Sequence, residues 1–333
     1  MQKKLFAAVL GFFLLPAAFA QPAPKIACDR ACLENYIDRY HDAMLAKEVK
    51  PDLFAKTCRF TENGVELPLG KEGLWHSMSG RGTYKFYIPD VETQQIAYIG
   101  TVKEGGPLPG AKTAPGAKPP VATTAAVAIR LKIVDGLITE AEQLVIRPEQ
   151  SLFGDAPASR FPPAGEAVEK MGAPHPIFTE VIPEAQRHSR EELIRIGDYY
   201  FVGLQRNDGK GYYPFTEDSV RFENGIVACG LDADGNLIPY ACKKQFESGL
   251  EGIVTRIRDR RFVAVDRERG IVFAFAFFDH LPINWTWQLA ELFKIEGENI
   301  RRIEAIFHRC PYGMNSGWST YEQGMSEEIQ SIR

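Results

Sequence analysis

The stretch RFTENG at Arg59–Gly64 returns almost unchanged as RFENG at Arg221–Gly225. Alternating Arg and Phe are typical of a β-strand. Glu-Asn-Gly is typical of a tight hairpin turn, because Asn and Gly accept the positive φ that such a turn requires. From the first stretch to Pro148 is 89 positions, and from the second to Pro311 is 90. The two stretches therefore begin segments of nearly equal length.

The similarity extends on both sides of these stretches. Upstream, LENYIDRY at Leu33–Tyr40 aligns with LIRIGDYY at Leu193–Tyr200. Downstream, KIVDGLITEAEQLVIRP at 132–148 parallels KIEGENIRRIEAIFHRCP at 294–311. Solenoid repeats have shorter periods, of about 20 to 50 residues. The chain therefore contains a duplicated domain, present as two globular copies.

Each copy begins with a helical pattern, in which apolar residues recur at three- and four-residue steps over 33–45 and 193–204. Strand-like runs follow, with a short helical piece at 73–78 in the first copy and at 242–249 in the second. The runs of the second copy are 219–227, 254–266, 270–280, 284–297 and 299–309. This order predicts an α+β fold, with a long N-terminal helix packed on a curved, mostly antiparallel sheet in each copy.

The first twenty residues have the pattern of a cleavable secretory signal. Lys3 and Lys4 precede an apolar run at Leu5–Leu15, and the small-residue motif AFA ends at Ala20, which predicts cleavage after that residue. The run is shorter than the roughly 20 apolar residues that a membrane-spanning helix needs. We therefore expect an exported, soluble mature protein, periplasmic or secreted, without membrane insertion.

The charge of the mature chain argues against a polyanionic partner. Without Lys3 and Lys4, the formal net charge of −4 becomes −6. A nucleic-acid-binding surface needs clustered Lys and Arg that displace counterions from phosphates, whereas the basic residues here are scattered among Asp and Glu. We expect no nucleic-acid partner.

Composition divides the mature chain into two domains and their connections. We assign the first domain to 28–148, a Pro-, Gly- and Ala-rich linker to 149–187, the second domain to 188–320 and a C-terminal tail to 321–333. The linker composition is typical of an extended strap. A second Pro- and Gly-rich stretch at 103–120 is predicted to be a flexible hairpin tip between two strands of the first domain.

The mature part contains six cysteines, at positions 28, 32, 58, 229, 242 and 310. In an exported protein such residues favour disulfides. Cys229 and Cys242 flank a turn-rich loop, so their pairing is the preferred prediction; a pairing of Cys58 with Cys28 or Cys32 is the weaker one, and the last cysteine is expected to stay free. We expect no metal and no cofactor, because no zinc-ligand, P-loop or dinucleotide motif is complete.

The motifs together resemble two groups of known proteins. The order of a long helix, a strand pair, a short helix and a four-stranded meander resembles the ketosteroid isomerase and nuclear transport factor 2-like (SnoaL-like) superfamily. The stretches RFTENG-x-ELPLG-x-x-GLW, RIRDRRFVAVD, FFDH and PYGMNSGW resemble a family of exported tandem-domain proteins in it. The resemblance implies two cone-shaped domains, each with a pocket between helix and concave sheet, and an internal pseudo-dimer of the two.

The two copies differ along their last strand, where His308 aligns with Ile146 of the first copy. Alternation puts Glu304 and His308 on one side of that strand. The neighbouring apolar run FAFAFF ends in Asp279 and His280, and strands that are apolar on both faces are buried on both. We therefore expect these titratable residues around a cavity or at its rim.

Charged and aromatic residues supply further candidates. In RIRDRR, alternation sends Arg258 and Arg260 one way and Asp259 and Arg261 the other. Cations beside an Asp-His pair suit a carboxylate or an enolate, and a solvated lattice of salt bridges is the alternative. Glu223 ends a strand that leads toward the pocket mouth in the superfamily, but a hairpin turn explains it equally. Core packing is the alternative for the aromatic candidates, which are Tyr84, Tyr199, Tyr200, Trp285 and Trp287. His76 is a lone histidine in the short helical piece of the first copy.

Two functions stay open. In the first, the second copy is a cofactor-independent lyase, dehydratase or isomerase that transfers protons on a small aromatic or polyketide-like compound. Its catalytic candidates are Asp279, His280, His308, Tyr199 and Glu223, and its substrate-binding candidates are Arg261, Trp285, Trp287, Tyr200, Glu304, His76 and Tyr84. In the second, both copies are ligand-binding or scaffold modules. An enclosed pocket of about 300 Å3 or more that gathers His308, Asp279 and a tyrosine favours the enzyme.

Overall fold

The computed structural model describes residues 27–105, 121–148, 162–206, 208–230, 241–249 and 254–330. The predicted signal at 1–20, most of the stretch at 103–120 and the first part of the linker lie outside these ranges. The expectations for them stay predictions.

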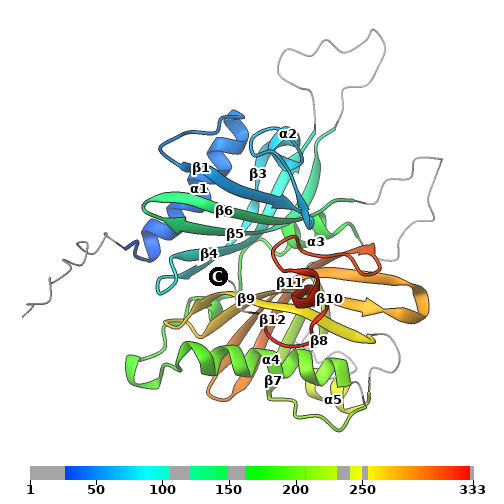
Figure 1. Ribbon diagram of the computed structural model, residues 1–333. Helices are drawn as coiled ribbons and strands as arrows, with labels where there is room; N and C mark the ends of the chain where they lie inside the picture. Colours follow the sequence, from blue (N-terminus) through cyan, green and yellow to red (C-terminus); the bar gives the residue numbers. More distant parts are fainter. Residues whose placement is uncertain are drawn as a thin grey trace, which may run out of the picture.

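The described chain folds into two domains with the same order of elements (Figure 1). The first domain contains α1 (Arg30–Ala46), β1 (Phe54–Glu62), β2 (Val65–Glu66), α2 (Leu74–Ser77), β3 (Met78–Asp90), β4 (Gln95–Glu104), β5 (Thr123–Val134) and β6 (Leu137–Ile146). The second contains α4 (Arg190–Arg206), β7 (Phe215–Glu223), β8 (Ile226–Cys229), α5 (Cys242–Glu247), β9 (Arg256–Asp266), β10 (Ile271–His280), β11 (Trp285–Glu296) and β12 (Asn299–Pro311).

Both sheets have six strands in equivalent orders, β2-β1-β6-β5-β4-β3 and β8-β7-β12-β11-β10-β9. In each sheet one pair is parallel, β1 with β6 and β7 with β12, and the other pairs are antiparallel. The predicted α+β fold of two tandem domains is confirmed. The predicted turns are confirmed as well, since Asn63, Gly64, Asn224 and Gly225 all have φ between 50° and 79°.

The two sheets pack back to back, so that the molecule has four layers. Helix α1 covers one face of the first sheet, and α4 covers the equivalent face of the second. We call the face under the helix the inner face of each sheet, and the face toward the other domain the outer face. A third apolar cluster joins the outer faces of the two sheets, with Phe86 and Leu144 from the first domain and Phe273 and Phe275 from the second. One face of strand β10 packs on α4 and the other packs on the first domain. This burial on both sides explains why the strand is apolar on both faces.

Ion pairs hold the domain interface around this apolar centre. The guanidinium of Arg261 donates two hydrogen bonds to Glu142 of the first domain, at 2.7 and 2.9 Å. Arg261 pairs with Glu142 and Asp259 and is 2% exposed. The salt bridges of the alternative interpretation are therefore present, but they lie at a buried domain interface and not on a solvated edge, and the expected place of Arg261 at a ligand pocket is wrong. A bulge at Asp259, with φ 50°, breaks the predicted alternation: Arg258 and Arg261 share the outer face, while Arg260 bonds Gln205 of α4.

The linker and the tail are more structured than their composition predicts. Within the described part of the linker, α3 (Ala164–Lys170) packs on the first sheet, and two 3-10 helices follow at Pro176–Thr179 and Glu184–Gln186. The tail contains α6 (Tyr321–Met325). Just before it, the Trp318 Nε1 donates to Thr61 of the first domain at 2.8 Å. The segment between β12 and α6 therefore joins the two domains, while α6 itself packs on β9.

The disulfide between Cys229 and Cys242 is confirmed. The expected pairing of Cys58 is wrong, because Cys28 pairs with Cys32. These two residues flank the N-cap of α1, where the first helical turn brings their Cα atoms to 5.2 Å. Cys58 and Cys310 are free thiols.

Candidate functional site

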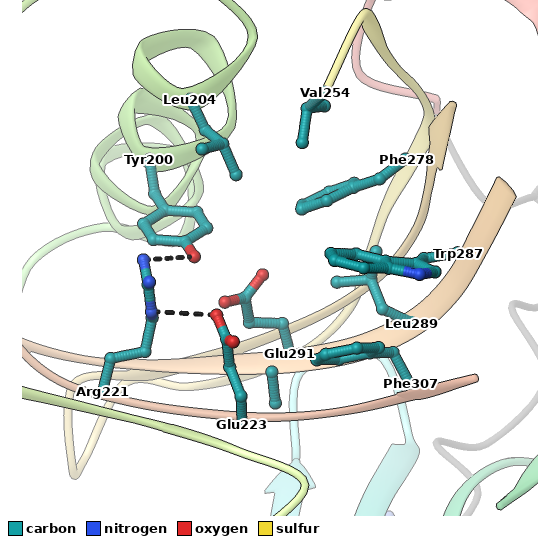
Figure 2. Close-up of a pocket in the computed structure, with 11 residues that line it drawn as sticks. Tyr200, Leu204, Arg221, Glu223, Val254, Phe278, Trp287, Leu289, Glu291 and Phe307 are labelled. Carbon is teal, nitrogen blue, oxygen red and sulfur yellow. Dashed lines mark hydrogen bonds and ion pairs between the residues drawn. The ribbon is translucent and has the colours of Figure 1, made fainter. Parts of the chain in front are cut away.

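A cavity of about 140 Å3 lies in the second domain, between α4 and the inner face of its sheet. Its apolar lining comes from Leu204, Val254, Phe278, Trp287, Leu289 and Phe307. Figure 2 shows three aromatic rings on one side and four polar side chains on the other: Tyr200, Arg221, Glu223 and Glu291. A mostly apolar wall with a few converging polar groups is typical of a small-molecule site.

Arg221 organises the polar side. Its Nη1 donates to the Tyr200 hydroxyl at 3.2 Å, and its Nη2 donates to Gln245 of α5 at 2.6 Å. Its Nε lies 3.0 Å from Glu223 Oε1. These contacts fix the guanidinium between α4, β7 and α5. The charge of Glu223 is thus balanced by one arginine.

Glu291 projects from β11 into the cavity, between Tyr200 and the aromatic rings (Figure 2). It is 1% exposed, and its Oε2 has no hydrogen-bond partner in the described part of the chain. Burial raises the pKa of Glu291 to about 8; Arg221 opposes this rise and the charge of Glu223 adds to it. This carboxyl group is therefore mostly protonated at neutral pH.

Trp287 forms the aromatic wall with Phe278 and Phe307. Its ring stacks on Phe307 with the centroids 4.8 Å apart, and it lies 4.4 Å from the ring of His280. Both ring nitrogens of His280 are buried and lack hydrogen-bond partners among the described residues. Burial lowers the pKa of His280. His280, a catalytic candidate, is therefore a neutral ring that supports Trp287 and does not line the cavity.

A one-residue difference between the repeated stretches brings Arg221 into the cavity. Arg221 pairs with Ile303, and Phe60 pairs with Ala141 at the equivalent position, so Arg221 stands in the place of Phe60 and not of Arg59. The first copy has one additional residue before its turn, and a shift by one residue moves a side chain to the other face of a sheet. Arg59 accordingly packs on a tryptophan ring of the C-terminal segment.

The first domain fills the corresponding space with Gln143. This residue stands in the place of Ala305, because the pairs Glu62–Gln143 and Glu223–Ala305 are equivalent. Gln143 accepts a hydrogen bond from the Tyr40 hydroxyl at 3.1 Å and donates to Glu62 at 2.8 Å. The polar groups of the first domain therefore satisfy one another. In the second domain the short side chain of Ala305 leaves the space open.

Three of the predicted site residues line the cavity: Glu223, Tyr200 and Trp287. Burial raises the pKa of Tyr200 well above its usual range, so its hydroxyl stays protonated. The cavity lies where a pocket was expected, between the long helix and the sheet, but its volume is below 300 Å3 and it includes neither His308 nor Asp279.

His308 faces away from the cavity, and its predicted position is wrong. Along β12, Ala305 and Phe307 face the cavity, so alternation turns His308 to the outer face. Its Nε2 lies 3.1 Å from Gln288 Oε1. Burial lowers the pKa of His308 to about 4, and the charge of Arg147 in the first domain contributes.

Asp279 is also on the outer face, where it is fully buried. Arg258 Nε donates to its carboxylate at 2.8 Å and Thr286 Oγ1 at 2.7 Å, and Arg256 donates as well. Burial acts to raise the pKa of Asp279, but these hydrogen bonds outweigh it and leave the pKa below its usual value. Asp279 is therefore the centre of a structural ion network, and its predicted role as a base facing the pocket is wrong.

The other predicted residues lie outside the cavity as well. Tyr199 accepts a hydrogen bond from an arginine on the outer side of α4. Glu304 accepts a hydrogen bond from Tyr84 across the domain interface. His76 is exposed on α2, and Trp285 packs under an arginine side chain. The contacts of Tyr199, Glu304 and Trp285 are structural, whereas the exposed His76 is not part of the core.

Sequence reasoning missed Arg221, Glu291, Phe278 and Phe307. One signal could have found Glu291, because strand pairing places it where the first domain has the core residue Ile129. The difference between the copies that marks the cavity lies on β11, whereas the difference at His308 lies on the neighbouring strand β12. The repeated stretches align Arg221 with Arg59 in the sequence, so they do not indicate that Arg221 takes the place of Phe60 in the sheet.

Within the described ranges, no group of three or more His, Cys, Asp or Glu side chains is arranged to hold a metal ion. None of the helices in those ranges is both long and apolar enough to cross a bilayer.

Comparison with known proteins adds one match in the second domain. A protein family described as "Domain of unknown function (DUF8021)" matches residues 186–307, which include all the polar residues of the cavity. No curated protein matches the chain. A solved structure titled "Crystal structure of a de novo designed protein with curved beta-sheet" is 15% identical over 36% of this chain and 88% of its own, with a TM-score of 0.26. That score is too low to carry an argument.

Proposed function

We propose that the second domain binds a small, mostly apolar molecule in the cavity under α4 and exchanges protons with it through Glu291 and Glu223. An apolar cavity of about 150 Å3 takes up benzene in another protein, so a volume of about 140 Å3 suits a single ring with a short substituent. The reaction class is that of a cofactor-independent lyase, dehydratase or isomerase acting on a small aromatic compound, or on the ring-sized part of a polyketide-like one.

The observation that carries the proposal is the buried carboxyl group of Glu291, which points into a cavity and has an oxygen without a partner in the described chain. A general acid or base works best when its pKa is near the working pH, and the pKa of Glu291 is raised to about 8. A strongly perturbed group in a cleft is a common property of functional sites. Glu223 supplies a second carboxyl group, held by Arg221.

The sequence resemblance supports the proposal. In the ketosteroid isomerase and nuclear transport factor 2-like superfamily, the ligand pocket lies between the long helix and the concave sheet, where this cavity lies. We propose that the first domain is a non-catalytic scaffold, since Gln143 fills its equivalent space. Export after cleavage following Ala20 belongs to the same proposal and is tested by mass spectrometry of the mature N-terminus.

Deuterium exchange tests the proton transfer. The mature protein is incubated in D2O with a panel of one-ring ketones, alcohols and amines, and carbon-bound deuterium in each compound is measured by mass spectrometry after back-exchange in H2O, because O–H and N–H hydrogens exchange without an enzyme. We expect enzyme-dependent exchange into at least one compound, and its loss in Glu291→Gln and in Ala305→Gln. A compound that binds without any exchange would favour a ligand-binding module. Absence of binding across the panel would refute the proposal.

A further inference from the structure

We propose that the ligand of this cavity carries a single positive charge, as a small primary amine bound in its ammonium form between Glu291, Glu223 and the aromatic wall. This inference rests on the proposed function of the cavity and goes beyond it by naming the chemical class of the ligand.

The first argument is a count of charges. The titratable groups that face Glu291 are Tyr200 on α4 and Arg221 and Glu223 on β7, and the other lining residues in the described chain are apolar. One guanidinium thus stands against two carboxyl groups, of which Glu291 is buried and Glu223 is partly exposed. Arg221 is already engaged by Glu223, Tyr200 and Gln245. The second carboxyl group therefore lacks a counter-ion, and one cation would supply it.

The second argument is the position of the free acceptor. Oε2 of Glu291 is buried, without a hydrogen-bond partner in the described ranges, and the side chain points into the cavity beside Trp287 (Figure 2). An alkylammonium group donates up to three hydrogen bonds. Its charge is also attracted to the face of an aromatic ring, and Trp is the strongest such partner. Trp287 and Phe307 line the cavity beside this acceptor and form its aromatic wall, with their facing surfaces stacked on each other.

Ligands of other charge fit the same groups less well. An anion would lie beside the carboxylate of Glu223 and would find the guanidinium of Arg221 already paired with that carboxylate, so its charge would be repelled and left without a partner. A neutral ligand would leave Glu291 protonated, as it is in the free protein. The affinity of such a ligand would therefore not depend on pH near neutrality. The charge of the ligand can therefore be determined from the pH dependence of binding.

The proton balance of the proposed step is simple. An ammonium ion and the protonated carboxyl group of Glu291 form a complex of ammonium and carboxylate, and the carboxyl proton goes to the buffer. Below the pKa of Glu291, about 8, affinity should rise about tenfold per pH unit, and above it the affinity should level off.

Isothermal titration calorimetry of the mature protein at pH 6, 7, 8 and 9 tests the inference with three probes of similar size: benzylamine, benzyl alcohol and benzoate. At pH 7 we expect the binding of benzylamine to release close to one proton from Glu291. Titrations in two buffers of different ionisation enthalpy measure this release. Benzyl alcohol should bind more weakly at pH 8, with no proton release, and benzoate should not bind.

Two isosteric variants locate the effect. Glu291→Gln keeps the size of a group that is already neutral at pH 7, so the fold should persist, while benzylamine should lose at least about tenfold in affinity at pH 8 and all of its pH dependence. Glu304→Gln is the matched control, because Glu304 is also buried with a raised pKa but faces the domain interface. It should leave benzylamine binding unchanged.

Two outcomes would overturn the inference. If benzyl alcohol binds more tightly than benzylamine at pH 8, the cavity takes neutral ligands; the proposed function would stand, provided that Ala305→Gln abolishes that binding. If none of the three probes binds, both the amine inference and the proposed function fail.

Discussion

Glu291 of the second sheet stands in the position that Ile129 occupies in the first. Each is on the fifth strand of its domain in chain order, β11 and β5, and they pair with the equivalent residues Ala305 and Gln143. Ile129 is part of a closed core, whereas Glu291 faces a cavity. One fold thus carries, within one chain, both a filled and an open version of the same site.

Exchanging residues between the two domains should close the cavity. In Ala305→Gln, the new side chain should occupy the space as Gln143 does in the first domain. A probe at 100 times its dissociation constant stabilises the wild-type protein by about 2.7 kcal/mol. We expect benzylamine and benzyl alcohol to give no such stabilisation of the variant, as measured by thermal unfolding.

The reciprocal change is the control for this exchange. Gln143→Ala should lower the free energy of unfolding by about 1 to 3 kcal/mol, because Tyr40 and Glu62 lose a buried partner. It should leave probe binding in the second domain intact. Undiminished probe binding by Ala305→Gln would place the ligand elsewhere.

The raised pKa of Glu291 should make stability depend on pH. Unfolded, this group titrates near 4.5, and folded near 8, so between these values the folded protein holds a proton that the unfolded chain has released. The stabilising contribution is complete below pH 4.5 and is lost as the pH rises to 8, by about 1.4 kcal/mol per pH unit between these values. Urea unfolding of wild type and Glu291→Gln at pH 5, 6, 7 and 8 measures the difference, and parallel curves would contradict the assignment.

Asp279 should behave as a structural residue. In Asp279→Asn, Arg256 and Arg258 lose a buried counter-charge, and breaking a buried pair in this way costs about 3 to 5 kcal/mol. The affinity of the remaining folded protein for a probe should be unchanged. A variant of full stability that had lost probe binding or turnover would instead restore Asp279 as a pocket residue.

The disulfide between Cys229 and Cys242 should support the site from outside. It joins β8 to α5, and α5 carries Gln245, which holds Arg221. Replacing both cysteines by serine should lower the free energy of unfolding by about 3 kcal/mol and weaken probe binding.

The pair Cys28 and Cys32 closes a shorter loop, with a sequence separation of 4 against 13. Its double serine variant should therefore lose less stability, without any effect on binding. Equal losses of affinity in the two double variants would show that the link through α5 is not what holds the site.

Much of the fold could be predicted from the sequence because each copy repeats the same local signals. The helical periodicity of α1 and α4 and the Glu-Asn-Gly turns are encoded within a few residues, and the duplication shows them twice. The back-to-back packing of the sheets is encoded by residues distant in sequence. An apolar strand such as β10 shows that both faces are buried, but not which face meets α4 and which meets the other domain.

This ambiguity explains the errors at the site. The sequence points to His308 because it replaces Ile146 of the first copy, and to Asp279 because it ends an apolar strand, yet the face that carries both is the domain interface. The bulge at Asp259 reversed the direction of Arg261 without any glycine or proline to mark it. The one-residue difference between RFTENG and RFENG is visible in the sequence, but only the pairing with the neighbouring strand shows that Arg221 takes the place of Phe60.

A crystal structure of the mature protein with whichever benzyl probe binds most tightly is the most direct measurement. We expect its ring against Trp287 and its polar group within hydrogen-bonding distance of the Glu291 carboxyl group, with the equivalent space of the first domain still filled by Gln143. Density for the probe at the domain interface near His308, or a second-domain cavity closed by its own side chains, would contradict the assignment of this cavity as the functional site.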